Sequence, residues 1–420
     1  MSRFVGHGRH DVTDVSELVA VEDHLEALLG SITRPEPIEL RLADALGLVL
    51  TDDVTSEVTV PAFANAAMDG YAIIARDVQA ATVEEPVRLA VDGEVAAGPG
   101  DLPTVRAGRS VRIMTGAPMP PGADTVVPVE NTSTLGVDVL VHRAIEEGAH
   151  IRSPGEDLQP GQPLLAKGRR LAPADLGVLA AAGVSRVECL APPRVVVISS
   201  GDELVAADKH PEPGQIRDVN GPMLAAMVRA AGAVPFSAGI VRDDRKSLMY
   251  ALDTSLGHAD LIICTGGASA GTRDLLPDVI GALGEVHTAK VAMKPGMPQI
   301  RGVVAGCPVI GLPGNPVSAF VSFEVFARPV IRALQGRRDV QRPVVSATAA
   351  ETLHSPPGKR SYLRVRLARD GAAWSAHPTG AQGSHVVSSL ARADGLAVID
   401  EDVREVAAGE QVRVQLLVDS

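Results

Sequence analysis

The spacing of apolar residues divides the chain into stretches of different secondary structure. Ser16–Leu29 and Arg41–Leu50 carry apolar residues at helical spacing, so we predict two helices near the N-terminus. Between Asp53 and Arg152 short β-branched runs are separated by glycine, proline and aspartate, which predicts a β-rich segment. Its clearest runs are Arg88–Val91, Ser110–Met114, Thr125–Val129 and Val137–His142. A short helix is predicted at Pro173–Ala182, where proline suits the first turn.

From Pro193 the pattern alternates between apolar runs and segments of helical period. The predicted strands are Arg194–Ser199, Val234–Val241, Asp260–Cys264, Glu285–Val291 and Pro308–Leu312. The predicted helices are Gly221–Ala231, Arg245–Leu256, Asp274–Leu283 and Pro316–Leu334. This alternation predicts right-handed βαβ units on a mostly parallel sheet.

After Arg338 the chain returns to short strands separated by turns. The predicted strands are Val344–Glu351, Ser361–Leu367, Trp374–His377, Gly395–Ile399 and Gln411–Val418. They predict a small C-terminal β-barrel. The expected fold class is therefore multidomain α/β plus β, with a central α/β domain, a β-rich domain and the barrel.

Composition narrows the classes of partner. The chain has 420 residues, a formal net charge of −12 and 2% aromatic residues, which argues against a nucleic-acid binder that needs a basic surface and stacking platforms. No apolar run approaches the roughly 18 residues of a membrane span, so no membrane partner is expected. Three widely spaced cysteines, in or beside apolar segments, indicate buried thiols in a reducing compartment. We expect a cytoplasmic protein.

A glycine-rich loop, Thr265–Asp274, lies between a predicted strand and a predicted helix. Backbone N–H groups at such a position can converge on an anion, and α/β sheets bind ligands at this edge. The loop therefore predicts an oxyanion or phosphate cradle. The alternative is a plain tight turn in which glycine only supplies a positive φ.

Acidic residues follow several of the same strands. If the sheet is parallel, five carboxylates converge on one edge beside the loop: Asp202, Glu203, Asp243, Asp244 and Asp274. Such a cluster repels itself unless a hard cation shares it, and Mg²⁺ fits oxygen ligands and phosphates best. For the three aspartates before helices, capping of free N–H groups is the alternative.

Two lysines and a proline-rich turn complete this edge. Lys290 and Lys294 stand four apart, the second directly before Pro-Gly, and would favour an anionic ligand in an acidic protein. The alternative is a solvated pair. Pro313 and Pro316 make Leu312–Pro316 a rigid turn into a long helix, whose backbone either faces a ligand or merely ends a strand.

Seven motifs together resemble one enzyme family along nearly the whole chain, from about Ser16 to Val418. They are Asn65–Ala72, Arg112–Pro118, Gly155–Asp157, Ser199–Leu204, Gly266–Asp274, Lys294–Gly296 and Leu312–Ser318. In this order they resemble the molybdopterin molybdenumtransferases, the family of MoeA and the gephyrin E domain. The resemblance implies that molybdate is inserted into adenylylated molybdopterin, with Mg²⁺, to give molybdenum cofactor and AMP.

The resemblance also implies roles for individual residues. Catalytic positions fall on Asp69, Thr115, Asp157, Glu203, Lys290 and Lys294, and metal positions on Glu203, Asp243 and Asp274. Substrate-binding positions fall on Gly266, Gly267, Ser269, Gly271, Pro313, Pro316, Arg364 and Ser384. The hypothesis that follows is that the glycine loop holds phosphate, the acids position Mg²⁺, and the lysines hold molybdate or phosphate charge.

The family implies a homodimer in which the α/β domain of one subunit meets the Asp69 and Thr115 segments of the other. A molybdopterin adenylyltransferase is a candidate partner. The implied domains are a discontinuous linker domain (16–54 plus 153–192, with its N-terminal helix packing on the α/β domain), a β-rich domain (55–152), an α/β molybdopterin-binding domain (193–338) and the barrel (339–420).

One motif departs from the family pattern. Family members often carry Lys-Pro-Gly-Lys-Pro followed by an aromatic residue and glycine, whereas this chain has Met297 in place of the second lysine, and Arg301 is a candidate replacement. Preference between molybdate and tungstate is therefore open. Two other functions also remain open: adenylylation of molybdopterin, and a non-catalytic scaffold of the same fold.

Overall fold

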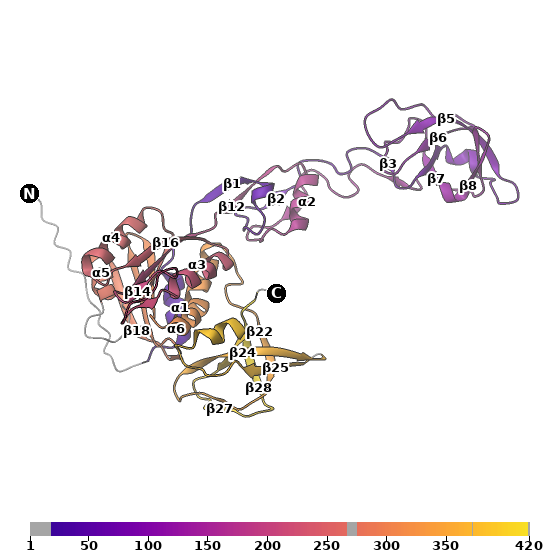
Figure 1. The fold of residues 1–420 in the computed structure, drawn as a ribbon. Coiled ribbons are helices and arrows are strands. Elements are labelled where there is room, and N and C mark those ends of the chain that lie inside the picture. Colours follow the sequence, from indigo (N-terminus) through magenta and orange to yellow (C-terminus); the bar gives the residue numbers. More distant parts are fainter. Residues whose placement is uncertain (1–17, 267–274, 372, 419–420) are drawn as a thin grey trace, which may run out of the picture. The chain divides into compact units, whose positions relative to one another are not determined.

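A computed structural model describes residues 18–266, 275–371 and 373–418 (Figure 1). The chain forms two compact units: unit 1 is Met1–Ile38 with Cys189–Ser420, and unit 2 is Glu39–Glu188. No helix among the described residues is long and apolar enough to cross a membrane. The finer division into four domains stays a prediction.

Unit 1 contains the predicted mostly parallel sheet. Its six strands are ordered β16 (Val234–Val241), β13 (Arg194–Ser200), β17 (Leu261–Thr265), β21 (Cys307–Leu312), β20 (Pro298–Val304) and β18 (Glu285–Lys290). The first four run parallel, whereas β20 is antiparallel to both of its neighbours. β20 was not predicted, and it inserts between β18 and the rest of the sheet.

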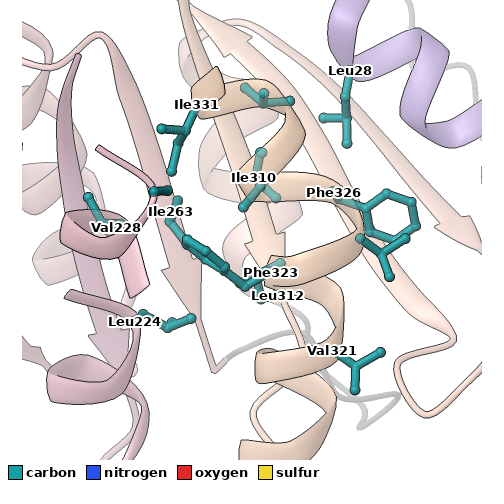
Figure 2. Packing of buried hydrophobic residues seen from close by; sticks show 14 of the residues in the cluster. Leu28, Leu224, Val228, Ile263, Ile310, Leu312, Val321, Phe323, Phe326 and Ile331 are labelled. Atoms are coloured by element: carbon teal, nitrogen blue, oxygen red, sulfur yellow. The ribbon is translucent and has the colours of Figure 1, made fainter. Parts of the chain in front are cut away.

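Helices cover both faces of this sheet. The helices of the unit are α1 (Val21–Gly30), α3 (Asn220–Ala230), α4 (Arg245–Leu256), α5 (Leu275–Leu283) and the continuous α6 (Pro316–Ser322), η4 (Phe323–Ala327) and α7 (Arg328–Leu334). Residues that alternate along each central strand face different clusters: α1, α3 and the α6–α7 helix pack on Val197 and Ile263, and α4 and α5 pack on Val196 and Ile262. Figure 2 shows Phe323 between the long helix and the strands that carry Ile263 and Leu312.

The C-terminal part of unit 1 is the predicted barrel. Five strands close on themselves through a β24–β26 pairing: β24 (Arg360–Asp370), β25 (Ala373–Pro378), β22 (Val344–Ala349), β28 (Gln411–Leu416) and β26 (Gly395–Ile399). A short strand, β19 (Met293–Lys294), adds to β24 in parallel. Smaller elements of the unit are β14 (Leu204–Val205), β15 (Ile216–Arg217), β23 (Leu353–His354), η5 (Val387–Arg392) and β27 (Glu405–Val406).

Unit 2 contains the predicted β-rich segment. A six-stranded sheet is ordered β7 (Thr125–Pro128), β4 (Gly70–Ile73), β6 (Arg109–Ile113), β5 (Val87–Val95), β9 (Asp138–Val141) and β8 (Thr132–Leu135). Three two-stranded ribbons are β1 (Pro37–Arg41) with β12 (Arg186–Leu190), β10 (Ile151–Arg152) with β3 (Asn65–Ala66), and β11 (Pro163–Leu165) with β2 (Val54–Thr55). The predicted helix is present as α2 (Pro173–Ala181), and short turns of helix are η1 (Leu42–Asp44), η2 (Ala75–Val78) and η3 (Val129–Asn131).

The predicted helix Arg41–Leu50 is wrong. Only the single turn η1 forms there, because Gly47 adopts a φ of +79° that no right-handed helix accommodates. Val49 instead forms an antiparallel β-bridge with Arg170, and the Leu50 N–H donates to the Arg169 carbonyl. In the first predicted helix, α1 begins at Val21 rather than Ser16.

Candidate functional site

Acidic residues lie at one corner of the unit 1 sheet, where the neighbouring strands β13 and β16 end. The Asp243 N–H donates to the Asp202 carboxylate at 3.2 Å, and the Ser200 hydroxyl lies 3.4 Å from the Asp243 carboxylate. The Glu203 carboxylate folds over Gly201, since a methyl group added there would lie 2.6 Å from it. The carboxylates of Asp202, Glu203 and Asp243 are all exposed at this corner, and their oxygens are of the kind that bind hard cations.

Asp244 has the alternative role that was left open for it. Its side chain accepts hydrogen bonds from the Lys246 and Ser247 N–H groups and so caps α4. The Ser247 hydroxyl also donates to this carboxylate. Together these hydrogen bonds, the one from the hydroxyl first, lower the pKa of the Asp244 carboxyl. Asp274, with Gly267, Ser269 and Gly271, lies outside the described residues.

Gly266 is the described part of the glycine loop. Its φ is +89°, and an added methyl group would lie 1.9 Å from the Ser200 carbonyl oxygen. On its other side it faces Gly314 of the Leu312–Pro316 turn. Glycine is therefore required at position 266 by both conformation and space, because Gly266 lies against both Ser200 at the end of β13 and Gly314 of that turn.

Asn220, at the start of α3, joins these segments and was not predicted as a site residue. Its Nδ2 donates to Thr265 Oγ1 at 2.9 Å and to the Gly314 carbonyl at 2.7 Å. Thr265 Oγ1 in turn donates to the Pro313 carbonyl at 3.2 Å. Within the described part of the chain, the buried Asn220 Oδ1 and Ser199 Oγ have no hydrogen-bond partner. In the sequence this asparagine looks like an ordinary residue at a helix start, so no signal distinguishes it.

These segments surround a cleft of about 340 Å³, which we call the glycine-loop cleft. It is lined by Ser199, Ser200, Glu203, Leu204, Ile216–Asn220, Thr265, Gly266, Pro298 and Pro313–Pro316. The predicted residues Glu203, Gly266, Pro313 and Pro316 therefore share one cleft.

Lys290 lies at the same edge of the sheet but far from the acidic corner. It ends β18, which is five strand positions away from β16, where Asp243 follows. At about 4.8 Å per strand, the two positions are about 24 Å apart along the sheet. Lys290 is thus at the edge where the sequence placed it, but the strand order, which the sequence does not reveal, separates it from Asp243.

Lys294 lines a second cleft, of about 310 Å³, which we call the barrel cleft. The cleft is lined by Lys294, Pro295, Glu351–His354, Ser361–Arg364, Pro378 and Gln382. Lys294 pairs with Ser361 of β24 through the backbone, and its side chain is exposed. Among the described residues its ammonium group has no ion-pair partner, and the same holds for Lys290.

Arg364, a predicted substrate-binding residue, is fully buried in the barrel. Its guanidinium donates to Ser389 Oγ and to the carbonyls of the loop 381–383 at 3.0 to 3.2 Å. Burial lowers the pKa of this guanidinium. Arg364 therefore holds the loop that precedes Ser384, whose own carbonyl accepts a hydrogen bond from the Val317 N–H of α6.

Arg301 does not replace the lysine that is missing at Met297. It lies in the middle of β20, opposite His287, rather than at the edge of the sheet. Its charge helps to lower the pKa of His24 in α1, and burial lowers the pKa of Arg301 itself. The turn at Met297 therefore keeps Lys294 as its cation.

Unit 2 contains a preformed pair of predicted residues, Asp69 and Thr115. The Asp69 carboxylate accepts hydrogen bonds from the Thr115 N–H and hydroxyl, both at 2.7 Å. These bonds, the backbone one first, lower the pKa of the Asp69 carboxyl. Asp157 is exposed in the loop between β10 and β11, and in the described parts its carboxylate has no hydrogen-bond or ion-pair partner.

The layered sheet, the closed barrel and the two clefts define a multidomain α/β protein whose glycine-loop cleft lies at the carboxyl edge of its sheet, where α/β proteins commonly bind ligands. Family descriptions match successive parts of it: "MoeA N-terminal region (domain I and II)" over residues 19–183, "Probable molybdopterin binding domain" over 196–333, and "MoeA C-terminal region (domain IV)" over 346–417. The chain belongs to the MoeA family of molybdopterin molybdenumtransferases and is an enzyme of molybdenum cofactor biosynthesis.

Similarity to individual proteins extends over almost the full length. Molybdopterin molybdenumtransferase 2 of Mycobacterium tuberculosis is 44% identical over 402 residues, which cover 94% of this chain and 98% of that relative. Molybdopterin molybdenumtransferase 1 of the same organism is 35% identical over 95% of this chain and 99% of its own. The crystal structure of a molybdopterin biosynthesis MoeA protein from Pyrococcus horikosii has a TM-score of 0.82 and 33% identity, covering 96% of this chain and all of that one.

Proposed function

We propose that this enzyme transfers molybdenum from molybdate to adenylylated molybdopterin and releases molybdenum cofactor and AMP. The observation that carries the proposal is the pair of clefts within unit 1, one lined by Gly266 and carboxylates and the other by Lys294, which has no ion-pair partner among the described residues. An extended substrate with a phosphate link needs both kinds of site.

The glycine-loop cleft suits the phosphate link. Gly266 brings backbone close to the cleft without a side chain, and Asn220 ties Thr265 to the Gly314 turn, so the walls are held before substrate arrives. Ser199, whose buried hydroxyl lacks a partner among the described residues, lies in the same wall. A preorganised wall loses little free energy to reorganisation when the link breaks.

The carboxylates at the corner suit a hard cation. Glu203 and Asp243 are exposed oxygen donors on neighbouring strand ends, which fits Mg²⁺ with several water ligands, and Asp274 would be the third ligand in this proposal. The described residues form no group of three side chains already arranged for a metal. When bound, Mg²⁺ supplies positive charge beside the phosphates.

The barrel cleft suits an oxyanion. Lys294 offers a compact charge with three donors, and Lys290 lies four residues before it at the end of β18. Arg364 holds the loop in front of Ser384 at the same barrel, so its role in this proposal is to position that loop. Molybdate is the anion proposed for this cleft.

We also propose that the enzyme works as a homodimer in the cytoplasm, with a molybdopterin adenylyltransferase as a partner that delivers substrate. In this proposal Asp69 and Thr115 of one subunit serve the clefts of the other. Mixing Asp69→Asn and Lys294→Met subunits tests it, because mixed dimers contain one intact site and regain activity. No regain in dimers shown to have exchanged subunits refutes the shared site.

The test of the function is AMP release from purified adenylylated molybdopterin, molybdate and Mg²⁺. The expected result is AMP release that requires molybdate and falls at least about 100-fold in Asp274→Ala, which removes a proposed metal ligand. Undiminished turnover in this variant would sink the metal site. Pyrophosphate release from ATP and molybdopterin would instead identify an adenylyltransferase, and absence of both reactions would favour a scaffold.

A further inference from the structure

The turn Lys294–Pro298 separates the two clefts. Its first two residues, Lys294 and Pro295, line the barrel cleft, whereas its last, Pro298, lines the glycine-loop cleft. The Val291 N–H donates to the Met297 carbonyl at 2.8 Å and closes the base of the turn. Whatever fixes the middle of this turn therefore fixes one wall of each cleft.

Gln299 and Ser322, which together we call the clamp, contact the middle of the turn and hold it in place. Gln299 Nε2 donates to the Gly296 carbonyl at 2.6 Å and to Ser322 Oγ at 2.7 Å. Gly296 rests directly on Ser322, because a methyl group added to Gly296 would lie 2.6 Å from Ser322 Oγ. Gln299 and Ser322 are 1% and 0% exposed, so water does not compete for these bonds.

The same contact ties the turn to the long helix. Ser322 is the last residue of α6, and Pro316, the first residue of α6, lines the glycine-loop cleft. The helix α6 thus connects Ser322, which holds the turn, to Pro316, which lines the same cleft as Pro298.

The clamp has an energetic cost, which suggests that the donor is needed at this position. Gln299 Oε1 is buried without a partner among the described residues, and an unsatisfied buried acceptor destabilises the folded state. An apolar side chain of the same size would avoid this cost. It would also leave the Gly296 carbonyl without its donor.

We propose that Gln299, with Ser322, is a positioning residue that holds the Gly296 turn so that the Lys294 ammonium meets the oxyanion in the barrel cleft. The inference rests on the proposed function, because it takes Lys294 as the anion-binding cation. Gln299 itself touches no reactant. Its effect on anion binding is transmitted through Lys294.

The experiment measures equilibrium binding of molybdate to the full chain by titration calorimetry in a double-mutant cycle. Gln299→Met keeps the side-chain volume and removes the donor; it should weaken molybdate binding about tenfold or more, since a displaced ammonium group loses a charge-assisted hydrogen bond to the anion. In the Lys294→Met background Gln299→Met should have no further effect. Ser322→Ala, which keeps the bond from Gln299 to Gly296, should weaken binding less.

The matched control is Gln335→Met. Gln335 is also buried in unit 1 and donates to a carbonyl, that of Ala231 at 3.0 Å, but it lines neither cleft. It should destabilise the protein similarly and leave molybdate binding unchanged. Equal effects of Gln299→Met and Gln335→Met on binding, or independent effects of Gln299→Met and Lys294→Met, would overturn the positioning role while the proposed function stands. If Lys294→Met leaves binding unchanged, the anion site itself is wrong and both proposals fall.

Discussion

His24 gives unit 1 a built-in sensitivity to acid. Its imidazole is 2% exposed in α1, stacks edge-on against Phe326 with ring centroids 4.8 Å apart, and has a buried Nε2 without a partner among the described residues. Burial, helped by the charge of Arg301, lowers the pKa of His24 from 6.5 to about 4. The folded protein therefore keeps this ring neutral at a pH at which the unfolded chain protonates it.

The magnitude follows from proton linkage. Between pH 6.5 and about 4 the unfolded state binds a proton that the folded state does not, so stability falls as the pH falls through this range. The stability that comes from keeping the His24 ring neutral is fully present above pH 6.5. At pH 5 the loss is about 2 kcal/mol, and below pH 4 it reaches about 3 kcal/mol. Either value is a large share of a typical free energy of unfolding, about 5–15 kcal/mol.

The assay is urea unfolding at pH 7.5 and pH 5, followed by the fluorescence of Trp374. This is the single tryptophan of the chain and lies in unit 1, so the signal reports the unit that contains His24. His24→Leu removes the titrating group and keeps an apolar side chain beside Phe326. Between pH 7.5 and pH 5, the free energy of unfolding of this variant should fall by about 2 kcal/mol less than that of the unchanged protein.

His210→Leu is the control, because His210 is an exposed histidine of the same unit. It should keep the pH dependence of the unchanged protein. If His24→Leu and the unchanged protein lose the same free energy between pH 7.5 and pH 5, the imidazole is not held neutral and the reasoning fails.

Other predictions concern single features. Thr115→Val removes one of two donors to Asp69, so the pKa of that carboxyl should rise, as measured by carbon-detected NMR; an unchanged pKa would contradict the hydrogen bond. Gly266→Ala should unfold at a lower temperature than Gly306→Ala, since both have positive φ but only Gly266 lacks space, and equal melting temperatures would refute the clash. Burial raises the pKa of all three thiols to about 11 or 12, so iodoacetamide at pH 8 should label them only after unfolding; labelling of the native protein would contradict their burial.

The alternation of strands and helices in unit 1 could be predicted because each apolar run is short and each helix has a marked face. The Arg41–Leu50 helix failed because apolar spacing does not show that Gly47 takes a positive φ. β20 was missed because it begins at a proline and includes Arg301 and Gly302, which weaken its strand pattern. Local pattern predicts elements, but not a glycine that interrupts one.

The candidate site divides in the same way. Motifs placed Glu203, Gly266 and Lys294 at the carboxyl edge of the sheet; Glu203 and Gly266 line the cleft there, whereas Lys294 lies in β19, which pairs with the barrel. The order of the strands decides which of them share a cleft, and that order depends on long-range pairing. Asn220 and Gln299 could not be found for a different reason: their importance lies in being buried polar groups with specific partners, which is a property of packing.

The use of cations in the chain supports the assignment of the barrel cleft. Only six of its 39 basic residues are lysines, and two of these stand four apart at Lys290 and Lys294. Within the described residues, every ion pair uses arginine or histidine as the cation, in keeping with arginine's planar fork for carboxylates. Arginine thus forms the ion pairs, whereas in the described part of the chain Lys290 and Lys294 have no ion-pair partner, in a protein of net charge −12. The Lys294 ammonium group at the barrel cleft, with Lys290 four residues before it, raises the local concentration of an oxyanion that the rest of the surface repels.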